Sequence, residues 1–191
     1  MIVIPAAVSG ASYYTFEEAR ELYDQGVYSE AETIFSRLAD EGDARAQYYL
    51  GRMDLTGRGG EPDPEAACDW FERAADNNHL AAFYEFGNCY FTGEGRKQDL
   101  DQALYLYGVA AERGQTQAQY KLARLFASGS GGVRKNSERA YIYLFLALRG
   151  DLGQAPLLRD SLEAELSEEQ LQRAQEFALK LLARQSRSEE G

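Results

Sequence analysis

Three side chains of this sequence, Cys68, Cys89 and His79, are of the types that form nucleophiles and metal sites. A histidine can activate a cysteine thiol for nucleophilic attack, and both residue types bind zinc. His79 is the only histidine of the chain, however, and a zinc site needs several ligands, which do not cluster near it in the sequence. We therefore interpret His79 as a solvated turn residue, and we expect neither a metal nor a cofactor.

The two cysteines stand at positions that are apolar in other copies of an internal repeat, which is described below. Cys68 corresponds to Leu104 and Tyr141, and Cys89 corresponds to Met53 and Leu125. A cysteine at an apolar position behaves as a small buried hydrophobe, whereas a reactive thiolate is partly exposed. Two cysteines in a chain of 191 residues set no disulfide framework. We expect both thiols to be buried, unpaired and unreactive, although the sequence leaves open whether they lie close enough to pair.

A glycine-rich segment, Gly129 to Lys135, reads GSGGVRK and invites comparison with a phosphate-binding loop. It lacks the spacing G-x-x-x-x-G-K-[ST] and follows no strand, so we interpret it as a loop between helices. Carboxylates are numerous but spread over solvent-facing positions, without a pair placed for acid–base catalysis. The sequence therefore predicts a protein that is not an enzyme.

The chain is acidic, with a net charge of −11 at pH 7 and a pI near 4.6. Binding to a nucleic-acid backbone needs clustered lysine and arginine side chains, so this charge argues against a nucleic-acid partner. Apolar runs fall well short of the ~20 residues that span a bilayer, and we expect a soluble protein.

Residues 1–11, MIVIPAAVSGA, are apolar and end in small residues. They lack the basic start and the longer apolar core of a secretory signal. We therefore expect a cytoplasmic protein. The alternative is a periplasmic or exported protein in which residues 1–11 are the remnant of a signal peptide.

The organisation of the chain becomes visible when the sequence is aligned with itself, because the same pattern returns every 36 residues. The segments that begin at Ala44, Leu80 and Thr116 match one another. Small, aromatic and apolar residues recur at fixed places, namely Ala46, Ala82 and Ala118; Tyr48, Tyr84 and Tyr120; Leu50, Phe86 and Leu122; and Gly51, Gly87 and Ala123. Such self-similarity predicts a repeat architecture.

Each repeat predicts two antiparallel helices with apolar residues at helical spacing. In the first repeat, Gly51 lies on the apolar face of the first helix and allows the partner helix to approach closely. Gly57 and Gly59 end this helix, and Asp63 with Pro64 begins the next one. Residues in the left-handed conformation are expected to close the three repeats: Asn78, Gly114 and Gly150.

Two further helix pairs flank the repeats. Thr15 to Gly42 predicts a tetratricopeptide-like pair, and Ser167 with Gln170 has the pattern of a capping box at the start of a last helix. The expected fold class is all-α, a right-handed α/α solenoid with about five antiparallel helix pairs. This single domain divides into an N-terminal pair at 13–42, repeats at 43–78, 79–114 and 115–150, C-terminal capping helices at 151–184 and a flexible tail at 185–191.

The repeated unit reads A-x-A-x-Y-x-L-G-x-(M/L)-x-x-x-G-x-G, followed by Asp and by A-x-x-(W/Y)-(F/Y)-x-x-A-A. It resembles the Sel-one-like repeat family, a branch of the tetratricopeptide-type solenoids, over residues 43–150. Ala123 and Leu148 depart from the pattern in the third copy. The resemblance implies a binding role without naming a partner, because members of the family serve as adaptors in unrelated assemblies. One branch has a helix-joining disulfide in each repeat, and this chain lacks that series of cysteines.

The first helix of each pair is expected to line a concave face, which we expect to bind a protein or a peptide. An Arg–Asn–Arg row beside a row of tyrosines supports this, because tyrosine and arginine are frequent binding hot spots. Packing is the alternative explanation for the tyrosines. The candidate partner-binding residues are Arg45, Tyr48, Arg52, Tyr84, Asn88, Phe91, Tyr120, Arg124 and Ser128. The alternative function is a structural subunit that is buried in a larger assembly, for example in the cell envelope. For the adaptor, we expect a monomer.

Overall fold

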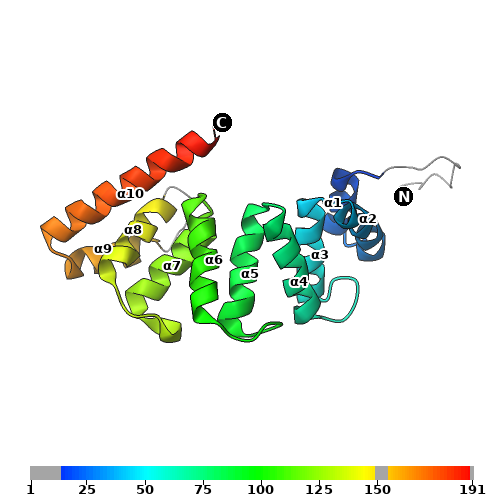
Figure 1. Cartoon of the computed structure of the whole chain (residues 1–191), viewed down its shortest axis with the longest axis horizontal. Coiled ribbons are helices and arrows are strands. Elements are labelled where there is room, and N and C mark those ends of the chain that lie inside the picture. The colour runs from blue at the N-terminus through cyan, green and yellow to red at the C-terminus, as the bar shows by residue number, and fades with distance from the viewer. Residues whose placement is uncertain (1–13, 149–154, 190–191) are drawn as a thin grey trace, which may run out of the picture.

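The computed structural model describes residues 14–148 and 155–189 of the chain. Helices are the only regular elements of these two segments, and they lie side by side as a row of antiparallel pairs (Figure 1). The all-α solenoid expected from the repeat is therefore confirmed. The interpretation of residues 1–11 and the expected cap at Gly150 concern residues outside the described segments.

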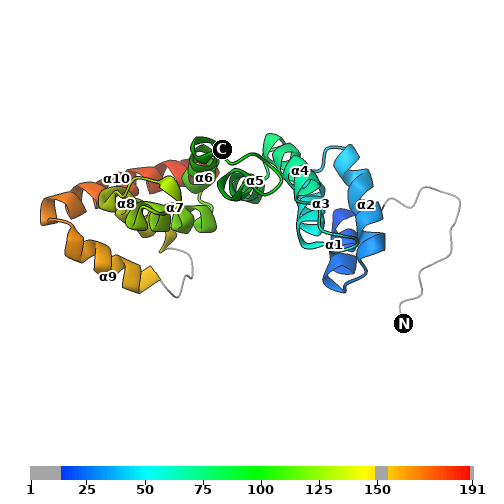
Figure 2. The same ribbon diagram turned by 90° about the horizontal axis from the view of Figure 1, so that it is seen from below.

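The helices follow the repeat along the chain. Their bounds are α1 Phe16–Asp24, α2 Tyr28–Asp40, α3 Ala44–Thr56, α4 Pro64–Asp76, α5 Leu80–Thr92, α6 Leu100–Glu112, α7 Thr116–Ser128, a short 3-10 turn at Ser130–Gly132, α8 Ser137–Ala147, α9 Ala155–Glu165 and α10 Glu168–Glu189. Figure 2 shows an arch in which α1 and α9, near the two ends, extend further to one side than α5 at the middle. The side that carries the first helix of each pair is concave.

Side chains and glycines at the helix ends explain why the helices begin and end where they do. Asp43 and Asp63 are N-caps whose carboxylates accept backbone N–H groups of α3 and α4. Gly57 and its equivalent Gly93 end α3 and α5 in the left-handed conformation, with φ of 68° and 80°. Asn78 closes the first repeat with φ 65°, which confirms the prediction for this residue.

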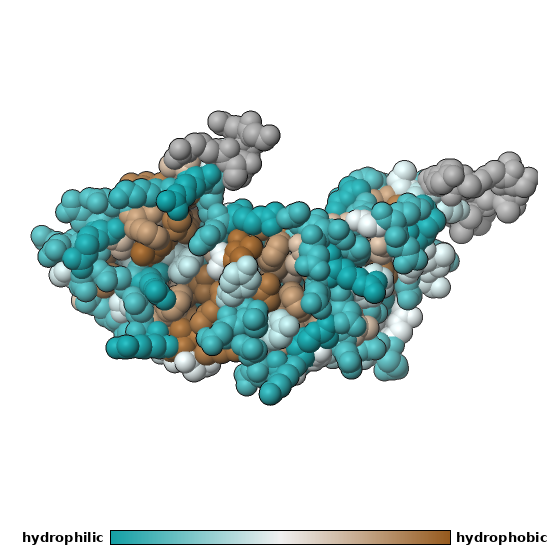
Figure 3. All heavy atoms as spheres, in the orientation of Figure 1, coloured by the Kyte–Doolittle hydropathy of each residue, from teal (hydrophilic) through white to brown (hydrophobic). Residues whose placement is uncertain are grey.

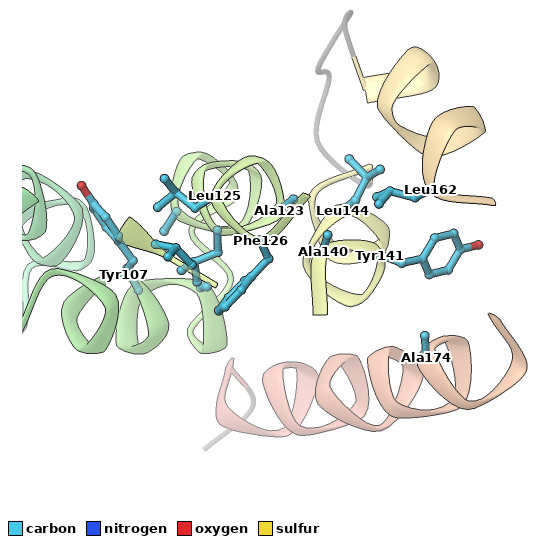
Figure 4. Close-up of a cluster of buried hydrophobic side chains, with 14 of the residues drawn as sticks. Tyr107, Ala123, Leu125, Phe126, Ala140, Tyr141, Leu144, Leu162 and Ala174 are labelled. Carbon is cyan, nitrogen blue, oxygen red and sulfur yellow. The ribbon is translucent and has the colours of Figure 1, made fainter. Parts of the chain in front are cut away.

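A glycine sits at the crossing of the two helices in each of the first two repeats. A Cβ atom on Gly51 would lie 2.7 Å from the ring of Phe71, and one on Gly87 would lie 2.7 Å from the ring of Tyr107. A side chain larger than hydrogen would therefore force the helices apart. The third repeat has Ala123 at this place, and the aromatic ring is replaced by Leu144 (Figure 4).

The last helix closes the C-terminal end of the solenoid by packing against α8. Ser167 and Gln170 form the expected capping box, with hydrogen bonds of 2.9 and 3.3 Å. Helix α10 continues to Glu189 and so passes the expected start of a flexible tail at residue 185. The physical reason is that Gln185 Nε2 donates to the carbonyl oxygens of Ala111 and Glu112, at 3.0 and 2.9 Å, and so caps the end of α6.

None of the described helices is both long enough and apolar enough to cross a membrane.

Candidate functional site

The concave face carries the same pair of side chains in the first and third repeats. Arg52 lies above the ring of Tyr48 in α3, and Arg124 lies above the ring of Tyr120 in α7. The distance from the guanidinium carbon to the ring centre is 6.0 Å in both pairs. A guanidinium that rests on an aromatic ring loses few of its hydrogen-bonding sites, because it interacts through its face. Both arginines therefore keep donors for a ligand.

The middle repeat differs, because its Asn88 already has partners within the protein. The Tyr107 hydroxyl donates to Asn88 Oδ1 at 2.7 Å, and Asn88 Nδ2 donates to Glu85 Oε2 at 3.0 Å. Burial raises the pKa of Tyr107, which keeps its hydroxyl protonated as the donor. Asn88 thus links α5 to α6, and its amide is less available to a ligand than its place in the row suggests.

The row of tyrosines serves packing as well as the surface. Tyr48, Tyr84 and Tyr120 are all half-buried. The Tyr48 ring lies 5.9 Å from that of Phe71, and the Tyr84 ring lies 5.6 Å from that of Tyr107. Burial raises the pKa of both Tyr48 and Tyr84. The packing explanation therefore holds for Tyr48 and Tyr84, and the partial exposure of all three rings leaves binding by this row a prediction.

Arg45, at the start of α3, has partners of its own in the protein. Its guanidinium pairs with Glu17 of α1 at 3.2 Å and with Asp43 at 2.9 Å, and it lies 4.1 Å above the ring of Phe16. These contacts connect the N-terminal helix pair to the first repeat. Arg45 is therefore part of the frame around the concave face and is not a free cation on it.

A cleft of about 390 Å³ lies between α5, α7 and α9 and brings three candidates together. It is lined by Phe91, Lys121, Arg124, Leu125, Ala127, Ser128, Ser130, Leu158, Ser161, Leu162 and Glu165. The candidates Phe91, Arg124 and Ser128 are among these residues, whereas Arg45, Tyr48 and Arg52 lie elsewhere on the face. We call this hollow the α7–α9 cleft.

Lys121 lines the α7–α9 cleft and was missed by the sequence analysis. Its ammonium nitrogen lies 4.3 Å from the centre of the Phe91 ring. The repeat offers no signal for it, because the equivalent positions hold Tyr49 and Glu85. The contribution of α9 to the cleft was also unexpected, since this helix stands outside the three matching copies.

His79 stacks on Tyr48 with the two ring centres 4.4 Å apart, and it lines a second concave hollow of about 380 Å³. It is half-buried, so the expectation of a solvated turn residue is wrong. His79 occupies the N-cap of α5, where its side chain makes no capping bond, in contrast to Asp43 at the equivalent place. Burial lowers its pKa, because the charged imidazolium is poorly solvated there.

Cys68 and Cys89 form a disulfide bond, so the expectation of two unpaired thiols is wrong. The bond joins α4 of the first repeat to α5 of the second, across a Cα–Cα distance of 6.1 Å. Both residues are buried, as expected. The position of each cysteine was read correctly as apolar. Apolar positions on neighbouring repeats pack against each other, and this packing brings the two sulfur atoms within bonding distance.

The opposite side of the solenoid carries a larger hollow of about 840 Å³ over α6, α7 and α8, which we call the convex hollow. Apolar side chains reach the surface in this region (Figure 3), and Tyr105 is 67% exposed. Its cation Lys135 is paired with Glu165, and its Arg139 lies 5.5 Å above the Phe126 ring. Arg134 and Arg139 line this hollow and supply a matched control for the concave arginines.

Groups of three or more histidine, cysteine, aspartate or glutamate side chains that could hold a metal ion do not occur among the described residues.

The comparisons with known proteins agree with this architecture. The model of the Sel1 repeat matches residues 44–79, 81–115 and 116–152. A protective antigen of uropathogenic Escherichia coli with an SLR fold superposes with a TM-score of 0.72 and 27% identity, over 88% of this chain and 40% of the antigen. A Sel1 repeat protein from Oxalobacter formigenes superposes with a TM-score of 0.66 and 28% identity, over 72% of this chain and 56% of that protein. The chain thus spans only part of either structure's length. Comparison with curated proteins gives no match.

Proposed function

The chain belongs to the Sel1 repeat family, and from this premise we propose that it is a non-catalytic adaptor that binds a partner protein or peptide on its concave face. The fold is of a protein-interaction and scaffold type. The observation that carries the proposal is the repeated arginine–tyrosine pair of α3 and α7, in which the same side chains stand in the same geometry two repeats apart. An extended partner that lies along the arch contacts both pairs in turn.

Energetics support the arginines as contact residues. Arg52 and Arg124 have no ion-pair partner among the described residues, although the chain has 31 acidic side chains. A charge-assisted hydrogen bond contributes about 1.5–3 kcal/mol, so loss of both arginines weakens binding by at least about tenfold. Arginine on an aromatic ring is also a combination that recurs at the energetic centres of interfaces.

The experiment uses the full chain, immobilised, to capture partners from a lysate of the source organism, with identification by mass spectrometry. The double variant Arg52→Ala with Arg124→Ala is compared with a charge-matched control, Arg134→Ala with Arg139→Ala, whose residues line the convex hollow. We expect the first variant to lose the partner and the control to keep it, with circular dichroism and melting temperature unchanged in both. Retention of the partner by the concave variant and loss by the control would transfer the site to the convex hollow.

A structural subunit of a larger assembly is the second candidate function. The observation in its favour is the exposed apolar surface of α10, where Phe177 is 52% and Leu179 is 55% exposed. Size-exclusion chromatography separates the two candidates. An adaptor elutes as a monomer, whereas a subunit with uncovered apolar faces associates with itself as its concentration rises.

We also propose that the chain works in an oxidising compartment, the second of the two locations left open by the sequence. The disulfide between Cys68 and Cys89 supports this, because structural disulfides persist in oxidising compartments and are rare in the cytosol. Alkylation of thiols in intact cells before lysis tests it. Protection of both cysteines from the reagent supports the proposal, and labelling of both contradicts it.

A further inference from the structure

Two cations stand together in the α7–α9 cleft without a counterion. Lys121 and Arg124 are three residues apart on α7, and both line the cleft. Neither has an ion-pair partner in the part of the chain that the structure describes, whereas other arginines do, namely Arg37, Arg45, Arg96, Arg159 and Arg173. The α7–α9 cleft therefore places two cations side by side, neither of them in an ion pair.

The surroundings of Lys121 make its unpaired state unfavourable. Its ammonium group is half-buried above the Phe91 ring, and burial together with the neighbouring Arg124 lowers its pKa. An attraction to the ring offsets only part of the cost of removing a charge from water. An anion in the cleft would relieve both the desolvation and the repulsion between the two cations.

The one carboxylate at the rim already has its partners. Glu165 of α9 is bound to the Lys135 ammonium at 3.0 Å and to the Ser137 hydroxyl at 2.7 Å. These contacts lower the pKa of Glu165 and keep it charged and directed toward α8. The positive charge of the cleft therefore remains available to a ligand.

The remaining lining combines apolar side chains with the hydroxyl groups of Ser128, Ser130 and Ser161. Leu125 comes from α7, while Leu158 and Leu162 come from α9, whose Leu162 points toward Leu144 (Figure 4). At about 390 Å³ the cleft has the volume of a small ligand pocket and holds one or two side chains of a peptide. Such a lining suits a carboxylate that is close to an apolar side chain.

We propose that the α7–α9 cleft binds an acidic segment of a partner protein, with a Glu or Asp side chain against Lys121 and Arg124 and an adjacent apolar side chain against the partly exposed Leu158 of α9. This inference rests on the proposed adaptor function and names the chemistry of the partner. The charge of the cleft complements an acidic ligand, and charge-assisted hydrogen bonds give it specificity over an uncharged isostere.

The test measures binding of two fluorescein-labelled peptides to the full chain by fluorescence anisotropy. The first is fluorescein-Gly-Ser-Glu-Glu-Leu-Glu-Phe-Ser-Gly-amide, with the label on the N-terminal amine, and the second has Gln in place of each Glu. Amidation removes the terminal carboxylate, and the label is the same on both peptides, so the two differ in charge only at the three Glu side chains. We expect the Glu peptide to bind at least about tenfold more tightly than the Gln peptide, with a difference that decreases at high salt. Equal affinity for the two peptides overturns the proposal.

Three variants locate the site. Lys121→Gln and Leu158→Ser are expected to weaken binding of the Glu peptide, whereas Arg134→Gln, in the convex hollow, is expected to leave it unchanged. Unchanged binding by folded Lys121→Gln, with a native melting temperature, overturns the proposal. Loss of binding in Arg134→Gln, with native binding by Lys121→Gln, also overturns it and places the peptide in the convex hollow. The proposed partner binding on the concave face fails separately, if the lysate experiment captures the same partners with and without the concave arginines.

Discussion

Cys68 of α4 and Cys89 of α5 are joined by a disulfide bond across the boundary between the first and second repeats. Each repeat of a solenoid contacts only its neighbours, so the stability of the whole depends on these boundaries. A crosslink placed at one boundary stops the two repeats from separating, and it also restricts the unfolded chain over a separation of 21 residues.

Removal of this crosslink should destabilise the protein. For the double variant Cys68→Ala with Cys89→Ala we expect a loss of about 3 kcal/mol in the free energy of unfolding, measured by urea denaturation. The native chain in excess reductant is the control and should approach the variant. Rapid reaction of either cysteine with a thiol reagent in the unreduced native protein would mean that the bond is absent.

Gly87 is expected to tolerate no larger side chain, because its position faces the Tyr107 ring. We expect Gly87→Leu to lower the free energy of unfolding by about 3 kcal/mol through overpacking at the crossing of α5 and α6. Gly108→Ala in α6 is the matched control, since a Cβ atom there meets nothing within 4 Å. It should stabilise the protein by up to about 1 kcal/mol, because alanine favours the helix over glycine. Equal melting temperatures for Gly87→Leu and the native chain would contradict the packing described for this crossing.

The single histidine should make stability depend on pH near neutrality. Burial lowers the pKa of His79 in the folded chain, so the unfolded chain binds more protons between the folded pKa and the ordinary value of about 6.5. Stability is therefore fully present above about pH 6.5 and decreases as the pH falls toward the folded pKa. Urea denaturation at about pH 7.5 and about pH 5.5 measures the difference.

His79→Asp is the informative variant for this prediction. It restores the N-cap residue that the first repeat has in Asp43, whose carboxylate accepts two backbone N–H groups. We expect a gain of about 1 kcal/mol at neutral pH and loss of the pH dependence over the same interval. A native chain whose stability is the same at both pH values would show that protonation of His79 costs the fold nothing.

The internal repeat made much of the fold predictable from the sequence. The contacts between neighbouring repeats were not predictable in this way. Helix caps and the close crossing at Gly51 follow from local chemistry that recurs at fixed spacing, so self-alignment finds them. The disulfide depends on which position of one repeat faces which position of the next, and a single-repeat pattern does not contain that information. Lys121, which we propose as a binding residue, was missed for a related reason, because a side chain that occurs in one repeat only has no counterpart to mark it.

The third repeat has Ala123 where the first two repeats have glycine, and its second helix also differs at the position that faces Ala123. Gly51 faces Phe71 and Gly87 faces Tyr107, so a small residue on one helix accompanies a large ring on the other. In the third repeat the ring is replaced by Leu144, which is smaller and leaves room for the extra methyl group of Ala123 (Figure 4). The two positions are therefore expected to be coupled in energy.

A double-mutant cycle measures this coupling. Leu144→Phe alone should cost about 1–3 kcal/mol of unfolding free energy, because the ring meets the methyl group of Ala123. Ala123→Gly alone should cost about 1 kcal/mol through the lower helix propensity of glycine. The two changes together restore the pairing of a glycine with an aromatic ring that the other repeats have. The loss of unfolding free energy in the double variant should therefore be smaller than the sum of the two single losses, by at least about 0.5 kcal/mol. Strict additivity of the two losses would mean that these side chains do not meet at the crossing of α7 and α8.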